Sequence, residues 1–505
     1  MNLKALLAVF VCSPLLLAAA PSCESVASVV LPNTTVTAAE PVAAGAFPTP
    51  PGGRGPNAGA VYKRLPAFCR VTATLKPSND SDIGIEVWMP ASAWNGKLQS
   101  VGNGAWAGTI GYPALATALA AGYAAAGTDT GHRGNTAEFA TGHPEKLVDF
   151  AYRAVHEMTV AAKGIVAAYY SSGPRYSYWN GCSTGGRQAL AEAQRYPSDY
   201  DGIISGDPAN YVTGTQGAQV WTSAISHKNE AAYIPPAKYA LIHKAVLDRC
   251  DALDGVKDGV IEDPARCKFE PKVLECKGPD EPSCLTAPQV ETARAIYAGP
   301  GNFPGLEPGS EMGWASLAGP KTMDLALDTY RLLTFNDPQW NYLTFDPKAD
   351  EARAEKKIGG IMNSIDPNLR PFFSHGGKLI QYHGWADPGI APGNSVNYYN
   401  SVLRALGGTA KVERSYRLFM VPGMGHCGGG DGASTFDMVS ALDRWVAEGK
   451  APGRIVASRV VKGAVVRTRP LCPYPQAAVY KGSGSTDEAE NFSCSTGKLN
   501  GANTR

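Results

Sequence analysis

The stretch from Tyr176 to Tyr196, YSYWNGCSTGGRQALAEAQRY, limits most strongly what this chain can fold into. Its first five residues are rich in aromatic side chains and predict a strand, whereas residues 187–195 are strong helix formers followed by Pro197. Between them, GCSTG fits the pattern G-x-S-x-G. Strand, glycine-rich turn and helix together predict a nucleophile elbow, in which Ser183 would stand exposed at the strand end. The alternative is a glycine-rich turn that carries an idle serine.

Strand and helix patterns alternate over much of the remaining chain. Short alternating apolar runs within residues 68–89 predict antiparallel strands. Further strands are expected at 97–101, 123–128, 202–206, 378–382, 416–421 and near 454–461, and helices at 113–122, 149–170 and 436–448. Because the strands and helices alternate with short loops between them, we predict an α/β fold around a mainly parallel sheet.

The sequence changes character after residue 210. Residues 211–372 carry helical segments, cysteines and many prolines but few strand signals, so we predict a lobe inserted into a domain made of residues 68–210 and 373–505. Residues 23–67 are rich in Pro, Ala, Gly and Thr, and we expect an extended N-terminal arm. In residues 1–22, one lysine precedes an apolar run that ends in small residues, which is typical of a signal peptide.

The charge balance and the hydrophobic pattern argue against two classes of partner. The chain has 505 residues and a formal net charge of +1, which gives no support for nucleic-acid binding. We find no basic cluster for a membrane surface, and no later segment apolar for long enough to span a bilayer. We therefore expect a secreted or periplasmic protein with neither a nucleic-acid nor a membrane partner.

The number of cysteines is consistent with an exported protein. Of the eleven cysteines, Cys12 lies in the predicted signal peptide, and the even number that remains predicts disulfides. The alternative is a scatter of free buried thiols. Proximity in the sequence suggests four pairs and leaves two cysteines for each other: Cys23–Cys69, Cys250–Cys267, Cys276–Cys284 and Cys472–Cys494, with Cys182 and Cys427 remaining.

A serine nucleophile needs a base that takes its proton and an acid that orients the base. His426 lies in the glycine-rich loop PGMGHCGGG after one predicted strand, and Asp387 lies in HGWADP after another. Open α/β sheets place their sites at such strand ends, and the order Ser, Asp, His is that of the α/β-hydrolases. The alternatives are a surface-loop histidine and an aspartate that only forms a turn before proline.

Two cysteines connect this predicted triad. Cys182 immediately precedes Ser183, and Cys427 immediately follows His426. Because a disulfide holds its Cα atoms about 5.5 Å apart, a bridge between them would clamp nucleophile and base side by side. The alternative is an ordinary stabilising bridge that happens to lie nearby.

An oxyanion hole needs two backbone N–H donors. One is expected from Thr184, the residue after the nucleophile. The other is expected from the glycine-rich loop 102–108, GNGAWAG, in which we choose Gly104.

A second candidate site lies in the inserted lobe, in CDALDGVKDGV. Asp251, Asp254 and Asp258 are spaced by three and four residues on a tight glycine-containing loop. Carboxylate oxygens of this kind suit calcium, although the spacing is not that of an EF-hand. A solvated acidic turn is the alternative. Because the loop lies in the inserted lobe, we expect a structural ion.

Three motifs together resemble the tannase/feruloyl esterase family: GCSTGGRQ at 181–188, WADP at 385–388 and GHC at 425–427. The family's CS-D-HC signature matches Cys182-Ser183, Asp387 and His426-Cys427, and the resemblance runs from about residue 68 to 450.

This resemblance implies an α/β-hydrolase core with a large inserted lid domain, the disulfide set given above, and a calcium site in the lid. The implied ligands are the side chains of Asp251, Asp254 and Asp258 and the carbonyls of Val256 and Val260.

The resemblance also implies a serine esterase that hydrolyses small esters of aromatic acids, namely feruloyl or other cinnamoyl esters, galloyl esters, or the plastic-derived ester MHET. The segment after Asp387, Pro388-Gly389-Ile390, is closer to feruloyl esterases than to the MHET hydrolase, so we expect feruloyl esters. Asp207 departs from the family, which usually has a small residue there. Trp314 and Trp340 are candidates for contacts with the acyl ring. A catalytically inactive, calcium-stabilised binding protein is the remote alternative.

Overall fold

The computed structural model describes residues 22–50 and 59–496. The predicted signal peptide lies outside these residues, except for its last position. Within them, no helix is long and apolar enough to cross a bilayer.

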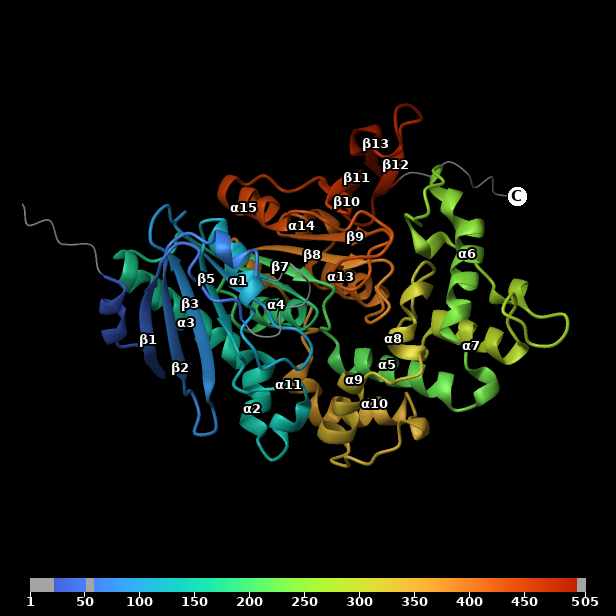
Figure 1. The fold of residues 1–505 in the computed structure, drawn as a ribbon, viewed down its shortest axis with the longest axis horizontal. Helices are drawn as coiled ribbons and strands as arrows, with labels where there is room; N and C mark the ends of the chain where they lie inside the picture. The colour runs from blue at the N-terminus through green and yellow to red at the C-terminus, as the bar shows by residue number, and fades with distance from the viewer. Residues whose placement is uncertain (1–21, 51–58, 497–505) are drawn as a thin grey trace, which may run out of the picture.

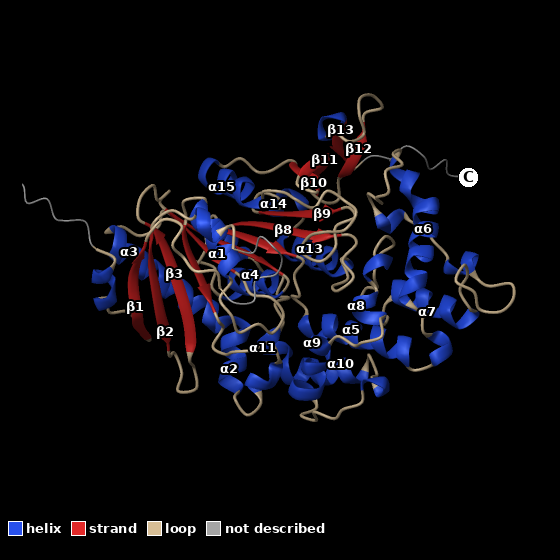
Figure 2. Ribbon diagram, in the orientation of Figure 1, coloured by secondary structure: helices blue, strands red, loops and turns tan. Residues whose placement is uncertain are grey.

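A nine-stranded sheet forms the centre of the molecule, in the order β1-β2-β3-β5-β4-β6-β7-β8-β9 (Figures 1 and 2). The strands from β5 to β9 in this order run parallel, and β1 to β3 add an antiparallel edge. This confirms the predicted α/β class. The bounds are β1 Thr34–Val42, β2 Phe68–Leu75, β3 Ile83–Pro90, β4 Lys97–Val101, β5 Ala124–Thr128, β6 Tyr176–Cys182, β7 Gly202–Gly206, β8 Lys378–Gly384 and β9 Tyr416–Val421.

Helices cover both faces of the sheet because the buried strands carry apolar side chains on both sides. Helices α3 (Ala154–Tyr170), α4 (Thr184–Arg195) and α13 (Gly393–Leu406) share one core with one face. Helices α1 (Tyr112–Ala120) and α15 (Met438–Glu448) share a second core with the other face. On β3, the fully buried Val87 and Trp88 point to these two cores in turn.

The N-terminal segment differs from the expected arm, because Thr34–Val42 is strand β1 at the sheet edge. The sequence pattern concealed it, because no residue of β1 is fully buried and Pro41 interrupts the run. Proline is tolerated at an edge, where its missing N–H breaks no ladder. The Cys23–Cys69 disulfide ties this segment to β2.

The region between β7 and β8 contains helices and no strand of a sheet, and it forms the green and yellow part of Figure 1. Trp314 is fully buried in its own core against Tyr239 and Tyr297, so it is a packing residue and not a ring contact for a ligand. The predicted lid boundaries stay a prediction. The helices are α5 Val212–His227, α6 Tyr239–Cys250, α7 Ala287–Ala298, α8 Ala315–Ala318, α9 Asp324–Asp328, α10 Ala349–Ala354, α11 Gly360–Met362 and α12 Arg370–Ser374.

The C-terminal region adds two hairpins, of which the sequence predicted one strand. They are β10 Ile455–Val461 with β11 Ala464–Leu471, and β12 Ala477–Tyr480 with β13 Phe492–Ser495. Two short helices, α2 Pro144–Val148 and α14 Thr409–Val412, complete the described α-helices. The predicted helix 149–170 begins with a π-helical turn over Asp149–Arg153.

The central sheet and the β10–β11 hairpin allow a matched test of core packing. Val87→Ala, at a position with 0% exposure on β3, should lower the free energy of unfolding by about 2–3 kcal/mol, because it removes two buried methyl groups and leaves a cavity. Val466→Ala, at a position with 48% exposure on β11, should change it by less than about 0.5 kcal/mol. Urea unfolding measures both, and equal losses would contradict the assignment of β3 to the core.

Candidate active site

The predicted elbow is present between β6 and α4. Ser183 has φ 64° and ψ −121°, and α4 begins at the next residue. The Ser183 N–H donates to the Gly206 carbonyl over 2.9 Å, which ties the turn to the end of β7. A Cβ atom on Gly181 would lie 2.5 Å from the Gly185 oxygen, so this turn requires glycine. The positive φ of a serine, which is normally unfavourable, is typical of a strained nucleophile turn.

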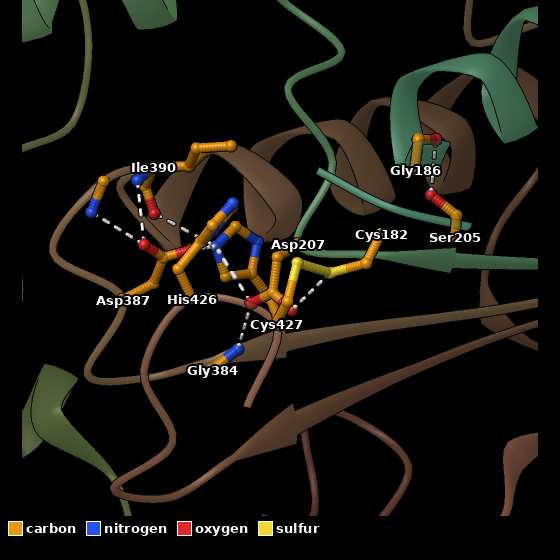
Figure 3. The surroundings of a disulfide bond; sticks show 11 residues. Cys182, Gly186, Ser205, Asp207, Gly384, Asp387, Ile390, His426 and Cys427 are labelled. Carbon is orange, nitrogen blue, oxygen red and sulfur yellow. Dashed lines mark hydrogen bonds and ion pairs between the residues drawn. A yellow bond between two sulfur atoms is a disulfide. The ribbon is translucent and has the colours of Figure 1, made fainter. Parts of the chain in front are cut away.

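The two other predicted triad residues lie at the ends of β8 and β9. Asp387 is fully buried, and its Oδ1 accepts hydrogen bonds from the N–H groups of Gly389 (2.7 Å) and Ile390 (3.0 Å). Its Oδ2 lies 2.7 Å from His426 Nδ1 (Figure 3). A carboxylate accepts, so Nδ1 carries the proton and Nε2 is left to act as a base.

Charges around His426 favour its protonated form. Burial alone would lower the pKa of His426, but the charge and hydrogen bond of Asp387, with the charge of Asp207, raise it to about 9. Burial would likewise raise the pKa of Asp387, but His426 and His383 hold it well below its usual range. The acid therefore stays ionised, and the imidazolium that forms when His426 accepts a proton is stabilised.

All five predicted disulfides are confirmed. The Cys182–Cys427 bridge joins residues separated by 245 positions and holds their Cα atoms 6.0 Å apart. Ser183 and His426 are each one residue, about 3.8 Å, from a clamped Cα atom. The bridge therefore keeps the elbow and the histidine loop together.

The two segments predicted to form the oxyanion hole are adjacent. The Asn103 carbonyl accepts from the Gly185 N–H over 2.8 Å, and the Ala105 carbonyl accepts from the Thr184 hydroxyl over 2.8 Å. Across residues 22–50 and 59–496, no acceptor contacts the backbone N–H of Thr184 or of Gly104. Both N–H groups are thus available, and their role stays a prediction.

Two buried residues that the sequence did not assign to the site adjoin the triad. His383 Nε2 lies 3.3 Å from Asp387 Oδ2, and both side chains are fully buried. Asp207 brings a carboxylate oxygen within 4.8 Å of ligand atoms of Asp387 and His426. The sequence marked Asp207 as unusual, but its position depends on how β7 pairs with β8.

The acidic loop of the helical region is internally hydrogen-bonded. Asp251 accepts from the N–H groups of Asp258 (3.1 Å) and Gly259 (3.0 Å), and Asp254 accepts from Val256 N–H (2.9 Å). Asp258 accepts from Val260 N–H over 3.1 Å. The loop is thereby folded with its carboxylates turned inward.

This loop fits calcium in its donor chemistry but only in part in its geometry. Burial, with the charges of Asp258 and Asp251, raises the pKa of Asp254 to about 7, as expected where negative charge lacks a counter-ion. Against this, Arg467 and Arg469 already contact the Asp258 carboxylate. Of the residues that the structure describes, these three aspartates do not form a group with all ligand atoms within 4.8 Å of one another. Calcium therefore stays a proposal.

The known proteins that this chain resembles are esterases. The sequence profile described as "Tannase and feruloyl esterase" matches residues 69–331 and 324–495. An uncharacterized esterase of Xanthomonas campestris is 38% identical over 94% of this chain and 91% of its own. Feruloyl esterase B of Aspergillus niger is 34% identical over 85% of this chain and 86% of its own.

Solved structures agree with this result. The crystal structure of feruloyl esterase B from Aspergillus oryzae superposes with a TM-score of 0.88 at 29% identity, covering 94% of this chain and 99% of that one. Tannin acyl hydrolase from Aspergillus niger, at 22% identity and a TM-score of 0.77, shares the fold and covers 94% of both chains.

The clamp can be tested with two matched double variants. Cys182→Ser/Cys427→Ser should lower kcat for ester hydrolysis by about 100-fold, because a displacement of 1 Å between reacting groups has an effect of that size. Cys276→Ser/Cys284→Ser removes a bridge across only 8 residues in the helical region and should leave kcat within about threefold. Similar kcat losses in both variants would contradict the clamp.

Calcium can be tested by its effect on thermal unfolding. If the loop binds calcium, adding the ion at 100 times its Kd should stabilise the protein by about 2.7 kcal/mol, and excess EGTA should reverse this. Asp254→Asn should abolish the response. Asp324→Asn, at an aspartate of the same region whose side chain is 82% exposed, should keep it. An unchanged Tm with calcium and EGTA in the parent protein would argue against the site.

Proposed function

The chain belongs to the tannase and feruloyl esterase family and is a carboxylic ester hydrolase, and we propose that it cleaves feruloyl and other hydroxycinnamoyl esters. The observation that carries the proposal is the Asp387–His426 pair, clamped by a disulfide beside a serine in a strained elbow. The choice of acyl group is supported by the relatives that are named feruloyl esterase B.

The proposed reaction is acyl transfer through Ser183. His426 Nε2 accepts the Ser183 hydroxyl proton while Ser183 Oγ attacks the ester carbonyl carbon. The N–H groups of Thr184 and Gly104 donate to the oxyanion that forms. His426 then gives its proton to the leaving alcohol oxygen, and the acyl group remains on Ser183.

The second half of the cycle repeats these roles with water. His426 takes a proton from water, the hydroxide oxygen attacks the acyl carbon, and Ser183 regains its proton as the aromatic acid leaves. Asp387 keeps His426 in the Nδ1–H tautomer and stabilises the imidazolium in both halves.

We also propose that the protein works outside the cytoplasm, secreted or in a periplasm. Five disulfides require an oxidising environment, because cytoplasmic thiols are kept reduced. A small aromatic ester is the proposed partner. An inactive binding module is less well supported, since nothing in binding alone requires the Asp387–His426 pair beside the strained Ser183.

Two experiments test the proposal: a comparison of three ester substrates and a substitution of the nucleophile. The parent protein should hydrolyse methyl ferulate with a higher kcat/KM than methyl gallate or MHET, and Ser183→Ala should lower kcat by about 10⁴-fold or more. Product release followed by chromatography measures both.

Two results would contradict these assignments. Undiminished turnover by Ser183→Ala would contradict the nucleophile. A preference for methyl gallate or MHET would leave the assignment as an esterase intact but would contradict the proposed feruloyl specificity.

A further inference from the structure

One carboxyl group contacts the elbow and the acid turn and lies close to the histidine. Asp207 follows the last residue of β7, and its side chain is fully buried. Its Oδ1 accepts from the Gly384 N–H over 2.8 Å, at the end of β8. Its Oδ2 lies 3.3 Å from Cys182 Sγ in the clamping disulfide (Figure 3).

Few titratable groups lie near the carboxylate of Asp207. The titratable groups that face it are Tyr382, His383 and Asp387 from β8 and the following turn, and His426 from the loop after β9. Among the described residues, no lysine or arginine forms an ion pair with it. A buried carboxylate without a cation is unfavourable, so the available positive charge is that of a histidine.

Hydrogen bonds fix the ring orientation of His383. Tyr416 donates to Gln381 Oε1, so the Gln381 amide N–H donates to Ser395 Oγ over 2.7 Å. The Ser395 hydroxyl can then donate to His383 Nδ1, 2.7 Å away, and His383 Nε2–H donates to the Ile390 carbonyl over 3.0 Å. His426 donates from Nδ1 to Asp387 Oδ2 over 2.7 Å, and its ring also lies close to the Asp207 carboxylate, so an imidazolium at His426 faces both acids.

The backbone holds Asp207 in place at a cost. Its φ is 36°, in the left-handed region that aspartate and asparagine tolerate better than most residues. The Asp207 N–H donates to the Tyr382 carbonyl over 2.9 Å, which fixes this conformation. A strained and buried acid at the site indicates a function.

We propose that Asp207 is a positioning residue that acts through His426, stabilising its imidazolium together with Asp387 and sustaining part of the turnover when Asp387 is removed. This inference rests on the proposed function, in which His426 is the base. The site would then contain two acids, Asp207 and Asp387, which follow the neighbouring strands β7 and β8. Asp387 orients the histidine by a direct hydrogen bond, whereas Asp207 acts by charge.

The pH profile of kcat/KM for methyl ferulate tests the charge. Asp207→Asn keeps the acceptor for Gly384 and the tolerance of the left-handed region, but it removes the negative charge. The pKa of His426 should fall, so more of the base is neutral at low pH and the acid limb should move down by about one unit, with a plateau about tenfold lower. Asp207→Gly, which any φ suits, should show the same shift if Asp207→Asn folds poorly.

The matched control is Glu192→Gln. Glu192 is also a fully buried acid, on α4, and its pKa is raised well above the usual value by burial and by Asp199. Its conversion to an amide should leave the acid limb in place. A shift equal to that of Asp207→Asn would overturn the proposal, and so would an unshifted limb in both Asp207 variants.

Substitution of Asp387 tests whether Asp207 sustains part of the turnover without it. Asp387→Asn should retain about tenfold more activity than Asp387→Asn/Asp207→Asn, since a pKa difference of one unit corresponds to a factor of ten. Equal activities would overturn the proposal. These outcomes are distinct from a failure of the proposed function, which would appear as a parent protein that cleaves none of the three test esters.

Discussion

The disulfide between Cys182 and Cys427 sets the geometry on which the rest of the site depends. Cys182 is the last residue of β6 and Cys427 lies in the loop after β9, and these two strands are separated in the sheet by β7 and β8. Three strand spacings of about 4.8 Å amount to about 14 Å, whereas the bridge requires a Cα separation of 6.0 Å. The elbow and the histidine loop must therefore lean toward each other over the ends of the two middle strands.

Glycine makes this approach possible. A Cβ atom on Gly384 would lie 2.3 Å from the Met424 oxygen, so the end of β8 can accept the histidine loop only without a side chain. The loop itself turns at Gly428 to Gly430, all with positive φ. Asp207, after β7, lies against the bridge and accepts from the Gly384 N–H at the end of β8, and His383 Nε2 lies 3.7 Å from its Oδ1. In this chain, the residue buried against the bridge is a second acid, Asp207.

The strands of the central sheet and the helices that cover it could be predicted well, because the residue patterns that mark them are local in the sequence. β4, β7 and β9 have the expected bounds, and the elbow follows from its own residues. The edge strand β1 was missed because both of its faces are partly exposed. Trp314 was misjudged because an aromatic side chain in a lid can pack inward as easily as outward. The role of Asp207 could not be predicted, because it depends on a long-range register that pairs Gly206 with Tyr382.

The Cys182–Cys427 bridge thus holds the serine and the histidine in position relative to each other, and this role can be measured. It is tested most directly by the rate at which a fluorescent phosphonate labels Ser183, measured while the bridge is reduced in steps and the reduced fraction is followed by mass spectrometry. The labelling rate should fall in proportion to the fraction of Cys182–Cys427 that is reduced, with the other four bridges intact. A labelling rate that stays unchanged when this bridge is fully reduced would contradict it.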